Sequence, residues 1–343
     1  MANLQIDAGA LAAYLKTAAP EWSGVTDVFQ MKGGQSNPTY RVDTDRGPVV
    51  LRMRPVGAPL WAHNIAREYK VLAALGPTDV PVPEVYHYCT DESVLGGEFY
   101  LMEFIEGRIE DDCRLPGYSP EERTAIYRSY VQAYARLHAV DWAAAGLSDF
   151  GKHDTYAARQ LHLHGKAFAG YCPEGMPNLD WLHAELTKRV PPQAKTGLVH
   201  GDVRMGNVVL HPTEPRVIAL LDWEMSTLGD VYADAAILTV PYFMPDNPQG
   251  YLGDTDFEAS GIPDLDTLIA WYCEDAGIME IPNLDFMILF NLYRYAAVNY
   301  GVGYRAEHGM SVSDDGHLFG LTALPISKRA RAMAEESIAA GRL

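Results

Sequence analysis

Long apolar runs and internal repeats are both absent from this chain of 343 residues. No apolar stretch approaches the roughly 20 residues that a membrane-spanning helix requires, so we predict no membrane span. The opening segment, MANLQIDAGALAAYL, contains no basic stretch followed by a continuous apolar one. Because a secretion signal needs both features, none is predicted, and we expect a cytoplasmic protein.

Cysteines and basic residues are scarce. The four cysteines form no C-x-x-C pair and show no spacing typical of zinc ligands, so we expect reduced, packed thiols. Lys and Arg number 27 against 45 Asp and Glu, which gives a formal net charge of -18. A protein of this charge repels nucleic acid and anionic membranes at long range, so we expect neither as a partner.

Two segments depart from the average charge. Residues 254–285 carry a run of Asp and Glu, whereas residues 152–166 carry Lys, Arg and His side chains against one acid, Asp154. Charged runs are most often solvated faces, which leaves both segments open as plain surface or as substrate-binding features. His162 and His164 are expected at the surface, because no partner stands at metal-ligand spacing.

The N-terminal third shows a β-β-β-α-β-β pattern. Residues 28–55 contain three short segments separated by the turns QSNP and RGP, which predicts three strands. Apolar residues at spacings of three and four over 65–76 predict a helix that stops before a Pro. The segment GEFYLMEFIEG then indicates a buried strand that runs out at Gly107.

The remainder is mainly helical. Ser119-Pro120-Glu121-Glu122 combines a capping Ser, a Pro at the first helical position and an acid, which is a helix start signal. Three short strands, GLVHGD, NVVLHP and VIALLDW, interrupt the helical segments. We therefore predict an α+β fold with an N-terminal lobe at 1–106 and a mainly helical C-terminal lobe at 107–343. The further helices are predicted at 154–168, 178–189, 264–276 and 283–300.

The strongest chemical pattern is the run HGDVRMGN, followed by a strand that ends in an acid. Phosphoryl transfer requires a carboxylate that faces the attacking hydroxyl and oxygen ligands for Mg²⁺ on the nucleotide phosphates. Asp202 in this run suits the first role. Asn207, at the end of the run, and Asp222, at the end of the strand, suit the second role.

This order of HGDxxxxN and a strand-end Asp resembles the aminoglycoside phosphotransferase family, whose members share the bilobal fold of protein kinases. The later run GDVYADAA resembles the family's GDPxxDLA segment, with Val231 in place of Pro. Asp230 and Asp234 in this run are expected to cap and brace the loop. The resemblance implies ATP- and Mg²⁺-dependent transfer to a hydroxyl of a small molecule, with GTP and the oligomeric state left open.

The resemblance extends to the N-terminal lobe and implies a nucleotide site there. Gly34, Ser36 and Asn37 lie in GGQSNPTY, where the family has a loop over the phosphates. Small residues let backbone N–H groups approach an anion. Arg52 stands where kinases have a phosphate-binding Lys, and Glu68 on the following helix would orient it.

Two further positions follow from the same resemblance. Met102-Glu103-Phe104-Ile105 matches the kinase hinge, so backbone groups of Glu103 and Ile105 would contact adenine. Arg204 stands where protein kinases have a Lys near the transferring phosphoryl group.

A narrower resemblance covers nearly the whole chain. The segments GGQSNPTYRV, VVLRMRPVG, AREYKVLAAL, FYLMEFIEGR, HGDVRMGN and LLDWEMSTLGD are similar to the kinase-like domain that accompanies some acyl-CoA dehydrogenases. That subgroup implies a hydroxyacyl acceptor, carried as a CoA thioester or as a free hydroxy acid. The basic run at 152–166 could then receive a polyanionic CoA ester, whereas the acidic run at 254–285 would suit a cationic aminoglycoside.

Several alternatives stay open beside the hydroxyacyl kinase. An aminoglycoside kinase shares every motif, and a non-catalytic nucleotide-binding module is kept open by Arg52. A protein kinase is disfavoured because DWE replaces DFG and no APE-like segment follows. A metallophosphatase is disfavoured because Val203 and Val208 stand where further metal ligands would be needed.

Overall fold

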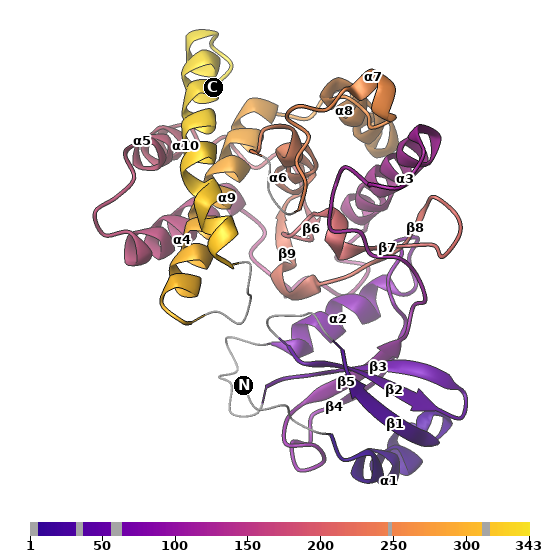
Figure 1. Ribbon diagram of the computed structural model, residues 1–343. Coiled ribbons are helices and arrows are strands. Elements are labelled where there is room, and N and C mark those ends of the chain that lie inside the picture. The colour runs from indigo at the N-terminus through magenta and orange to yellow at the C-terminus, as the bar shows by residue number, and fades with distance from the viewer. Residues whose placement is uncertain (1–5, 32–36, 56–63, 246–248, 311–315) are drawn as a thin grey trace. The chain divides into compact units, whose positions relative to one another are not determined.

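The computed structural model describes residues 6–31, 37–55, 64–245, 249–310 and 316–343 (Figure 1). The chain forms two compact units, an N-terminal unit of residues 1–107 with 219–226 and a C-terminal unit of 108–218 with 227–343. The segment 219–226 includes Asp222. The sequence-based division of the chain did not anticipate that this segment groups with the N-terminal unit.

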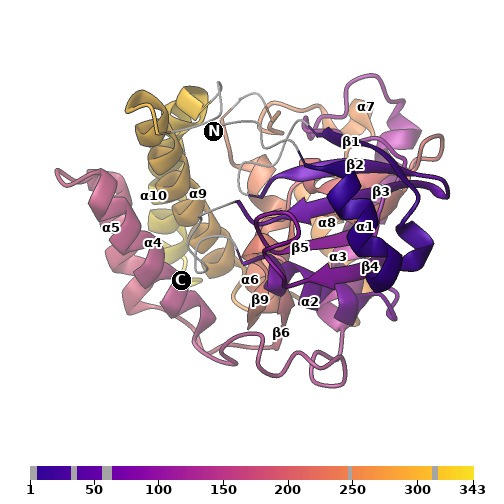
Figure 2. The same ribbon diagram turned by 90° about the horizontal axis from the view of Figure 1, so that it is seen from below.

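The N-terminal unit is a five-stranded antiparallel sheet in the order β1-β2-β3-β5-β4. Its two main helices, α1 and α2, lie on opposite faces of the sheet (Figures 1 and 2). The predicted β-β-β-α-β-β order is confirmed. The elements are α1 (Ala8–Ala18), β1 (Val25–Gln30), β2 (Thr39–Thr44), β3 (Gly47–Met53), α2 (Ile65–Leu75), β4 (Val85–Cys89) and β5 (Phe99–Glu103).

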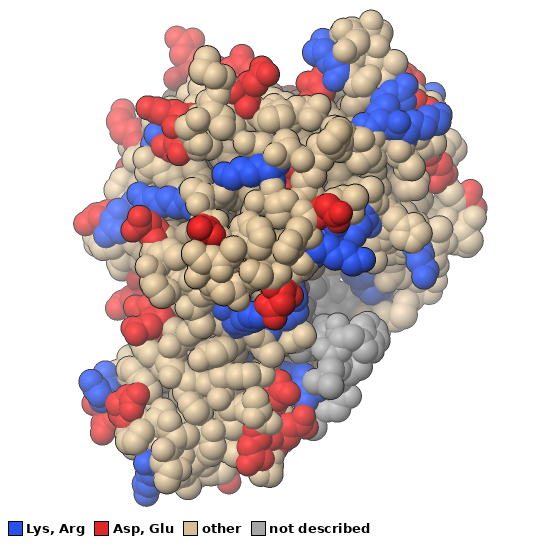
Figure 3. Space-filling model, turned by 180° about the vertical axis from the view of Figure 1, so that it is seen from behind, with Lys and Arg blue, Asp and Glu red and all other residues tan. Residues whose placement is uncertain are grey.

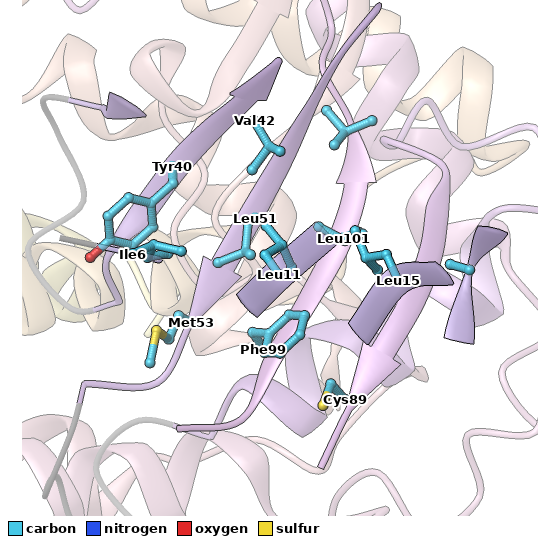
Figure 4. Packing of buried hydrophobic residues seen from close by; sticks show 12 residues of the cluster. Ile6, Leu11, Leu15, Tyr40, Val42, Leu51, Met53, Cys89, Phe99 and Leu101 are labelled. Atoms are coloured by element: carbon cyan, nitrogen blue, oxygen red, sulfur yellow. The ribbon is translucent and has the colours of Figure 1, made fainter. Parts of the chain in front are cut away.

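The core of this unit lies between α1 and the sheet. Leu11 and Leu15, one turn apart on α1, pack against the face of the sheet that carries Leu51 and Leu101 (Figure 4). Asp7 caps α1 by accepting hydrogen bonds from two backbone N–H groups of its first turn. This helix was not predicted, although an Asp followed by apolar residues at helical spacing is a usable signal.

Strand alternation directs polar side chains to the other face. Arg52 lies between Leu51 and Met53 in β3, so its side chain points away from α1 and toward α2. The α2 helix begins at an Asn64 cap and presents Glu68 inward, where that carboxylate is only 2% exposed. Two charged side chains therefore meet in the interior of a small domain, a costly arrangement unless they pair.

The C-terminal unit is mainly helical, as predicted. Its two strands β6 and β9 pair antiparallel, and the short strand β7 follows the HGDVRMGN run. Its helices are α3 (Pro120–Ala139), α4 (Tyr156–Tyr171), α5 (Pro177–Lys188), α6 (Val231–Ala235), α7 (Phe257–Ser260), α8 (Leu265–Ala276), α9 (Leu284–Glu307) and α10 (Gly316–Ala339). Its strands are β6 (Thr196–Val199), β7 (Val208–Leu210) and β9 (Thr227–Asp230), and β8 (Val217–Leu220) runs from this unit into the segment with Asp222.

The predicted helix starts agree closely with the structure. Ser119 forms the expected capping box with Glu122 at the start of α3. The four further helices are also present, but α9 continues to Glu307, beyond the predicted end at residue 300. The last helix, α10, was not predicted; Pro325 stands inside it and obscures its pattern.

Two local expectations have different outcomes. All four cysteines are buried, as expected. The expectation that His164 lies at the surface is wrong, because this side chain sits on the inner face of α4 and is buried. His162, two residues earlier on the helix, is exposed. Helical geometry separates the two rings by about 200° around the axis, so they cannot share an environment.

The surface shows no large area of one charge on the face in Figure 3, where basic and acidic side chains are interspersed. None of the helices formed by the described residues is both long enough and apolar enough to cross a membrane.

Helices α9 and α10 cross at two glycines, which gives a test of the packing. A Cβ added at Gly303 would lie 2.5 Å from the Cα of Gly320, so Gly303→Ala must push the helices apart. We expect this variant to lose about 1–3 kcal/mol of unfolding free energy in urea denaturation. Gly170→Ala in α4 meets no atom within 4 Å and should be neutral or slightly stabilising. Equal stability of the two variants would contradict the close contact.

Candidate functional site

One group of the predicted site residues lies in the loop that follows β6 in the C-terminal unit. Asn207 donates from Nδ2 to the Asp202 carboxylate oxygen Oδ2 at 2.8 Å and to the Asp202 carbonyl at 2.9 Å. Arg204 approaches the same Oδ2 with its Nε at 3.4 Å. These contacts fix one oxygen of Asp202 and leave its Oδ1 to face a ligand. Arg204 also donates to Asp111 at 3.2 Å.

The backbone before Asp202 is braced from α6. The backbone N–H groups of His200 and Gly201 donate to the two carboxylate oxygens of Asp234 at 2.7 and 2.8 Å. Gly201 has a φ of +84°, a left-handed conformation that only glycine adopts without strain. The sequence-based expectation that Asp234 braces this loop is confirmed.

The carboxylate of Asp234 is fully buried yet remains charged. Burial alone would raise the pKa of Asp234, but the nearby His138 ring and the His200 backbone N–H outweigh it and hold that pKa below its usual value. His138 lies 3.1 Å from the carboxylate and is itself held by the Tyr272 hydroxyl at 2.9 Å. A buried network of this kind fixes a single geometry for the turn.

Asp230 has the capping role expected of it. Its carboxylate accepts from the backbone N–H of Tyr232 at 3.1 Å, which caps α6, and from that of Ala194 at 3.3 Å. The helix that carries Asp234 is thereby tied to the segment before β6.

Another group of the predicted site residues lies in the N-terminal unit, around Glu68. The carboxylate of Glu68 pairs with Arg52 Nε at 2.7 Å and accepts from Asn37 Nδ2 at 2.7 Å. The Tyr100 hydroxyl donates to it at 3.1 Å, because the β3–β5 register places Tyr100 opposite Arg52. The Glu68 carboxylate therefore contacts all three side chains and fixes the position of Arg52.

Charges in this cluster depend on one another. Burial raises the pKa of Glu68, while Arg52 and the Asn37 amide oppose that rise. Burial by itself would lower the pKa of Arg52, but Glu68, Tyr100 and Asp222 together keep it above its ordinary value. Arg52 therefore remains a cation at any physiological pH.

The structure gives Asn37 a different environment from the one the phosphate-loop prediction implied. Its side chain is buried and bonded to Glu68, so it faces the interior of the unit rather than an open phosphate site. Gly34 and Ser36 of the same predicted loop lie outside the described residues.

Asp222 lies in a tight turn directly after β8. Its φ of +64° is unusual for a residue other than glycine, although Asp tolerates this region better than most. The turn is fixed by the Trp223 indole, which donates to the Leu220 carbonyl at 3.0 Å, and by Arg67, which donates to the Ser226 carbonyl at 3.2 Å. The Oδ1 of Asp222 lies 3.6 Å from Arg52 and has no hydrogen-bond partner among the described residues.

The donor set suits Mg²⁺ rather than a metal bound by protein alone. Among the described residues, no group of three or more His, Cys, Asp or Glu side chains could hold a metal ion. Mg²⁺ typically takes one or two protein oxygens and completes its shell with phosphates and water. In the N-terminal unit, the Oδ1 of Asp222 has no hydrogen-bond partner among the described residues and lies 3.6 Å from Arg52. In the C-terminal unit, Asn207 donates from its amide nitrogen to Asp202, so its amide oxygen can accept a cation.

The predicted hinge ends the sheet of the N-terminal unit. The Glu103 backbone N–H donates to the Glu84 carbonyl at 2.8 Å at the end of β5. Ile105 follows the strand, and its backbone has no hydrogen-bond partner within the described part of the chain. The N–H and C=O of Ile105 are therefore available to a ligand.

Comparison with known proteins decides the family. Residues 28–271 match the phosphotransferase enzyme family known as APH. The chain belongs to this family. It has the family's kinase-like fold, a five-stranded antiparallel sheet with a helix followed by a largely helical region.

Individual relatives fall into two groups. Acyl-CoA dehydrogenase family member 10 of Mus musculus is 38% identical over 91% of this chain, and the match covers 30% of the mouse protein. The chain spans less than half the length of the first curated relatives that it matches. A crystallised candidate aminoglycoside phosphotransferase of Ralstonia eutropha is 37% identical, with a TM-score of 0.88 over 97% of this chain and 99% of that one.

A more distant member shows the fold alone. Spectinomycin phosphotransferase, solved with ADP and spectinomycin, has a TM-score of 0.59 at 12% identity and covers 95% of this chain and 98% of that one.

Proposed function

We propose that this APH-family protein transfers the γ-phosphoryl group of ATP to a hydroxyl of a small molecule, with Mg²⁺ as cofactor. The observation that carries the proposal is the Asp202 carboxylate, which has one oxygen fixed by Asn207 and Arg204 and the other left to face an acceptor. A carboxylate held in this way orients the attacking hydroxyl and accepts its proton. The new bond joins the acceptor oxygen to phosphorus, and ADP leaves.

The remaining groups would bind and neutralise the donor. Arg52, oriented by Glu68, holds the α- and β-phosphates, and the hinge at Glu103 and Ile105 receives the adenine through backbone groups. Asp222 and Asn207 would hold Mg²⁺, which would supply positive charge to neutralise the transferring oxygens. Arg204 lies two residues from Asp202 and would steady the moving phosphoryl group. Structures of family members with ADP support ATP as the donor.

A cavity in the C-terminal unit supports an acceptor with an aliphatic part. Three consecutive residues of the catalytic loop line it, Val203, Arg204 and Met205. The rest of its wall is mainly aromatic and aliphatic: Cys113, Tyr127, Tyr130, Leu238, Val240, Pro241, Tyr251 and Tyr295, with Asp111, Gln249 and Gly250. Such a wall favours a hydrocarbon segment over a polycationic sugar, because Asp111 is the one carboxylate among its described lining residues and several amines could not all be paired there.

The two charged runs also bear on the acceptor. In the acidic run, Asp256 and Asp264 cap helices, while Glu274 and Asp275 pair with Arg128. These acids have structural partners, which weakens the case for an aminoglycoside site there. In the basic run, Lys152, His162 and Lys166 are exposed and available to a polyanion, whereas the exposed His153 ring contacts the Ser148 carbonyl at 2.8 Å.

We therefore propose a hydroxyacyl acceptor, as a CoA thioester or a free hydroxy acid. Parallel assays with hydroxyacyl-CoAs, the matching hydroxy acids and aminoglycosides, each with ATP and Mg²⁺, test it. We expect kcat/KM to be at least tenfold higher for a hydroxyacyl compound than for any aminoglycoside. Phosphorylation of aminoglycosides alone would overturn the acceptor class while leaving the kinase reaction standing. No transfer to any acceptor would support a nucleotide-binding module instead.

Arg52 gives a test of the nucleotide half of the site. Arg52→Met removes the cation that pairs with Glu68 and lies nearest Asp222, so we expect KM for ATP to rise at least tenfold. Arg52→Lys keeps the positive charge but loses the planar guanidinium that can donate two parallel hydrogen bonds. Its KM for ATP should lie between those of the wild type and Arg52→Met. Arg46→Met, at an exposed position in the turn between β2 and β3, is the control. An unchanged KM in Arg52→Met would contradict the phosphate-binding role.

A further inference from the structure

Helix α9 carries a buried cation that pairs with no carboxylate. Arg294 is only 6% exposed, and among the described residues no Asp or Glu lies within ion-pair distance of its guanidinium. Burying an unpaired charge is costly, so its position has to be compensated by other contacts. Those contacts show what the side chain does.

Four groups surround the guanidinium. It donates from Nη1 to Asn291 Oδ1 at 3.0 Å, from Nη2 to the Gly201 carbonyl at 3.3 Å and from Nε to His164 Nε2 at 3.4 Å. It also lies over the Phe290 ring, 5.5 Å from the centroid. Burial, and to a lesser degree the positive charge of Arg294, lowers the pKa of His164 to about 3. The ring therefore stays neutral, and its Nε2 can accept from Arg294.

The contact with Gly201 is the informative one. The Gly201 carbonyl belongs to the peptide bond that enters Asp202. The N–H side of the same turn is already held by Asp234, as described above. Arg294 therefore holds the carbonyl side, and the two together clamp a left-handed glycine turn from opposite directions. Both side chains that hold the turn, Asp234 and Arg294, come from helices outside the loop that carries Asp202.

The anchor of Arg294 is fixed to the same helix that holds Asp234. Asn291, which accepts from Arg294, donates to the Ala233 carbonyl at 2.8 Å. Ala233 directly precedes Asp234 in α6. Asn291 and Arg294 on α9 thus contact both α6, which carries Asp234, and the turn at Gly201. These two elements determine where the Asp202 carboxylate points.

We propose that Arg294 is a positioning residue, which orients the Gly201–Asp202 peptide so that the Asp202 carboxylate faces the acceptor hydroxyl. This inference rests on the proposed function for its catalytic consequence. Its structural content, the clamp on the turn, does not depend on that function. A displacement of a catalytic group by about 1 Å can cost a hundredfold in rate, so the clamp has a measurable effect.

The test compares Arg294→Gln with Arg305→Gln in the full-length protein. Arg305 is a matched control on the same helix, because it also donates to a neighbour, the Tyr171 hydroxyl at 3.0 Å, and lies 5.5 Å from an aromatic centroid. Two readouts are needed. Hydrogen exchange of the peptide containing residues 198–205, without nucleotide, reports the clamp. Turnover with ATP and the best acceptor reports its consequence.

We expect exchange at the His200 and Gly201 amides to become at least tenfold faster in Arg294→Gln and to stay unchanged in Arg305→Gln. We expect kcat to fall at least tenfold in Arg294→Gln with KM for ATP within threefold of wild type. Arg294→Lys keeps the charge and one donor, so it should recover part of kcat. If Arg294→Gln does not fold, the same two measurements are made on Arg294→Lys.

Unchanged exchange at the turn in both Arg294 variants would overturn the inference, whatever the turnover. An equal loss of kcat in Arg294→Gln and Arg305→Gln would also overturn it, because the effect would then be general to α9. If the wild type transfers phosphate to no acceptor, the proposed function fails, yet the exchange experiment still decides whether the clamp exists.

Discussion

Asp202→Asn is expected to lower kcat by roughly 10³-fold to 10⁴-fold, the largest loss of any single substitution in this protein. The amide keeps the size of the carboxylate but can neither accept the acceptor's proton nor attract it by charge, and general-base catalysis is typically worth 10²–10⁴. Steady-state kinetics with ATP, Mg²⁺ and a saturating acceptor measure the loss.

The rest of the site should remain intact in this variant. The substitution leaves Arg52 and Glu68 unchanged, so KM for ATP should stay within about threefold of wild type. Thermal unfolding should also be near wild type, because the Asp202 carboxylate is about one-third exposed. A variant with more than a tenth of wild-type kcat would contradict the role of Asp202.

Asp222→Asn is expected to reduce kcat at least a hundredfold, with a sharply increased requirement for Mg²⁺. Asp222 Oδ1 is buried without a hydrogen-bond partner among the described residues, and replacing this anion removes the only carboxylate proposed as a metal ligand. Loss of a preorganised electrostatic group typically costs 10²–10³ in kcat. A Mg²⁺ titration of turnover measures both effects.

Glu224→Gln is the matched control for this position. It stands two residues further along, is exposed, and also contributes to the field at Arg52. We expect it to keep at least half of wild-type kcat and an unshifted Mg²⁺ titration. If both variants respond alike, the effect of Asp222 is one of general charge, and the metal assignment is wrong.

The parts of the fold that were predicted are those whose signals are local. Turn residues and side-chain alternation defined the strands at 28–55, and a capping box defined the start of α3. Helix α1 was missed although its Asp7 cap is a local signal, whereas α10 was missed because its local signal is weak. Pro325 interrupts the apolar pattern of α10, and this helix exists because it packs closely along α9 through Gly303 and Gly320.

The site shows the same division. Asp202 and Asn207 stand within one short run, so the sequence alone selected them as site residues of one loop, and the structure adds the 2.8 Å hydrogen bond between them. Arg294 lies 93 residues from Gly201 and carries no motif, so only the folded chain reveals their contact. Asn37 was assigned to a phosphate loop by its neighbours in sequence, whereas its burial against Glu68 follows from tertiary packing.

We propose that Asp202 catalyses phosphoryl transfer from ATP to a small-molecule hydroxyl. The most direct measurement is phosphorus NMR of a reaction containing ATP, Mg²⁺ and a hydroxyacyl-CoA, with wild type and Asp202→Asn side by side. We predict a new phosphate monoester in an amount equal to the ADP formed by the wild type, and no detectable monoester from the variant in the same time. Equal monoester formation by both proteins would contradict the claim.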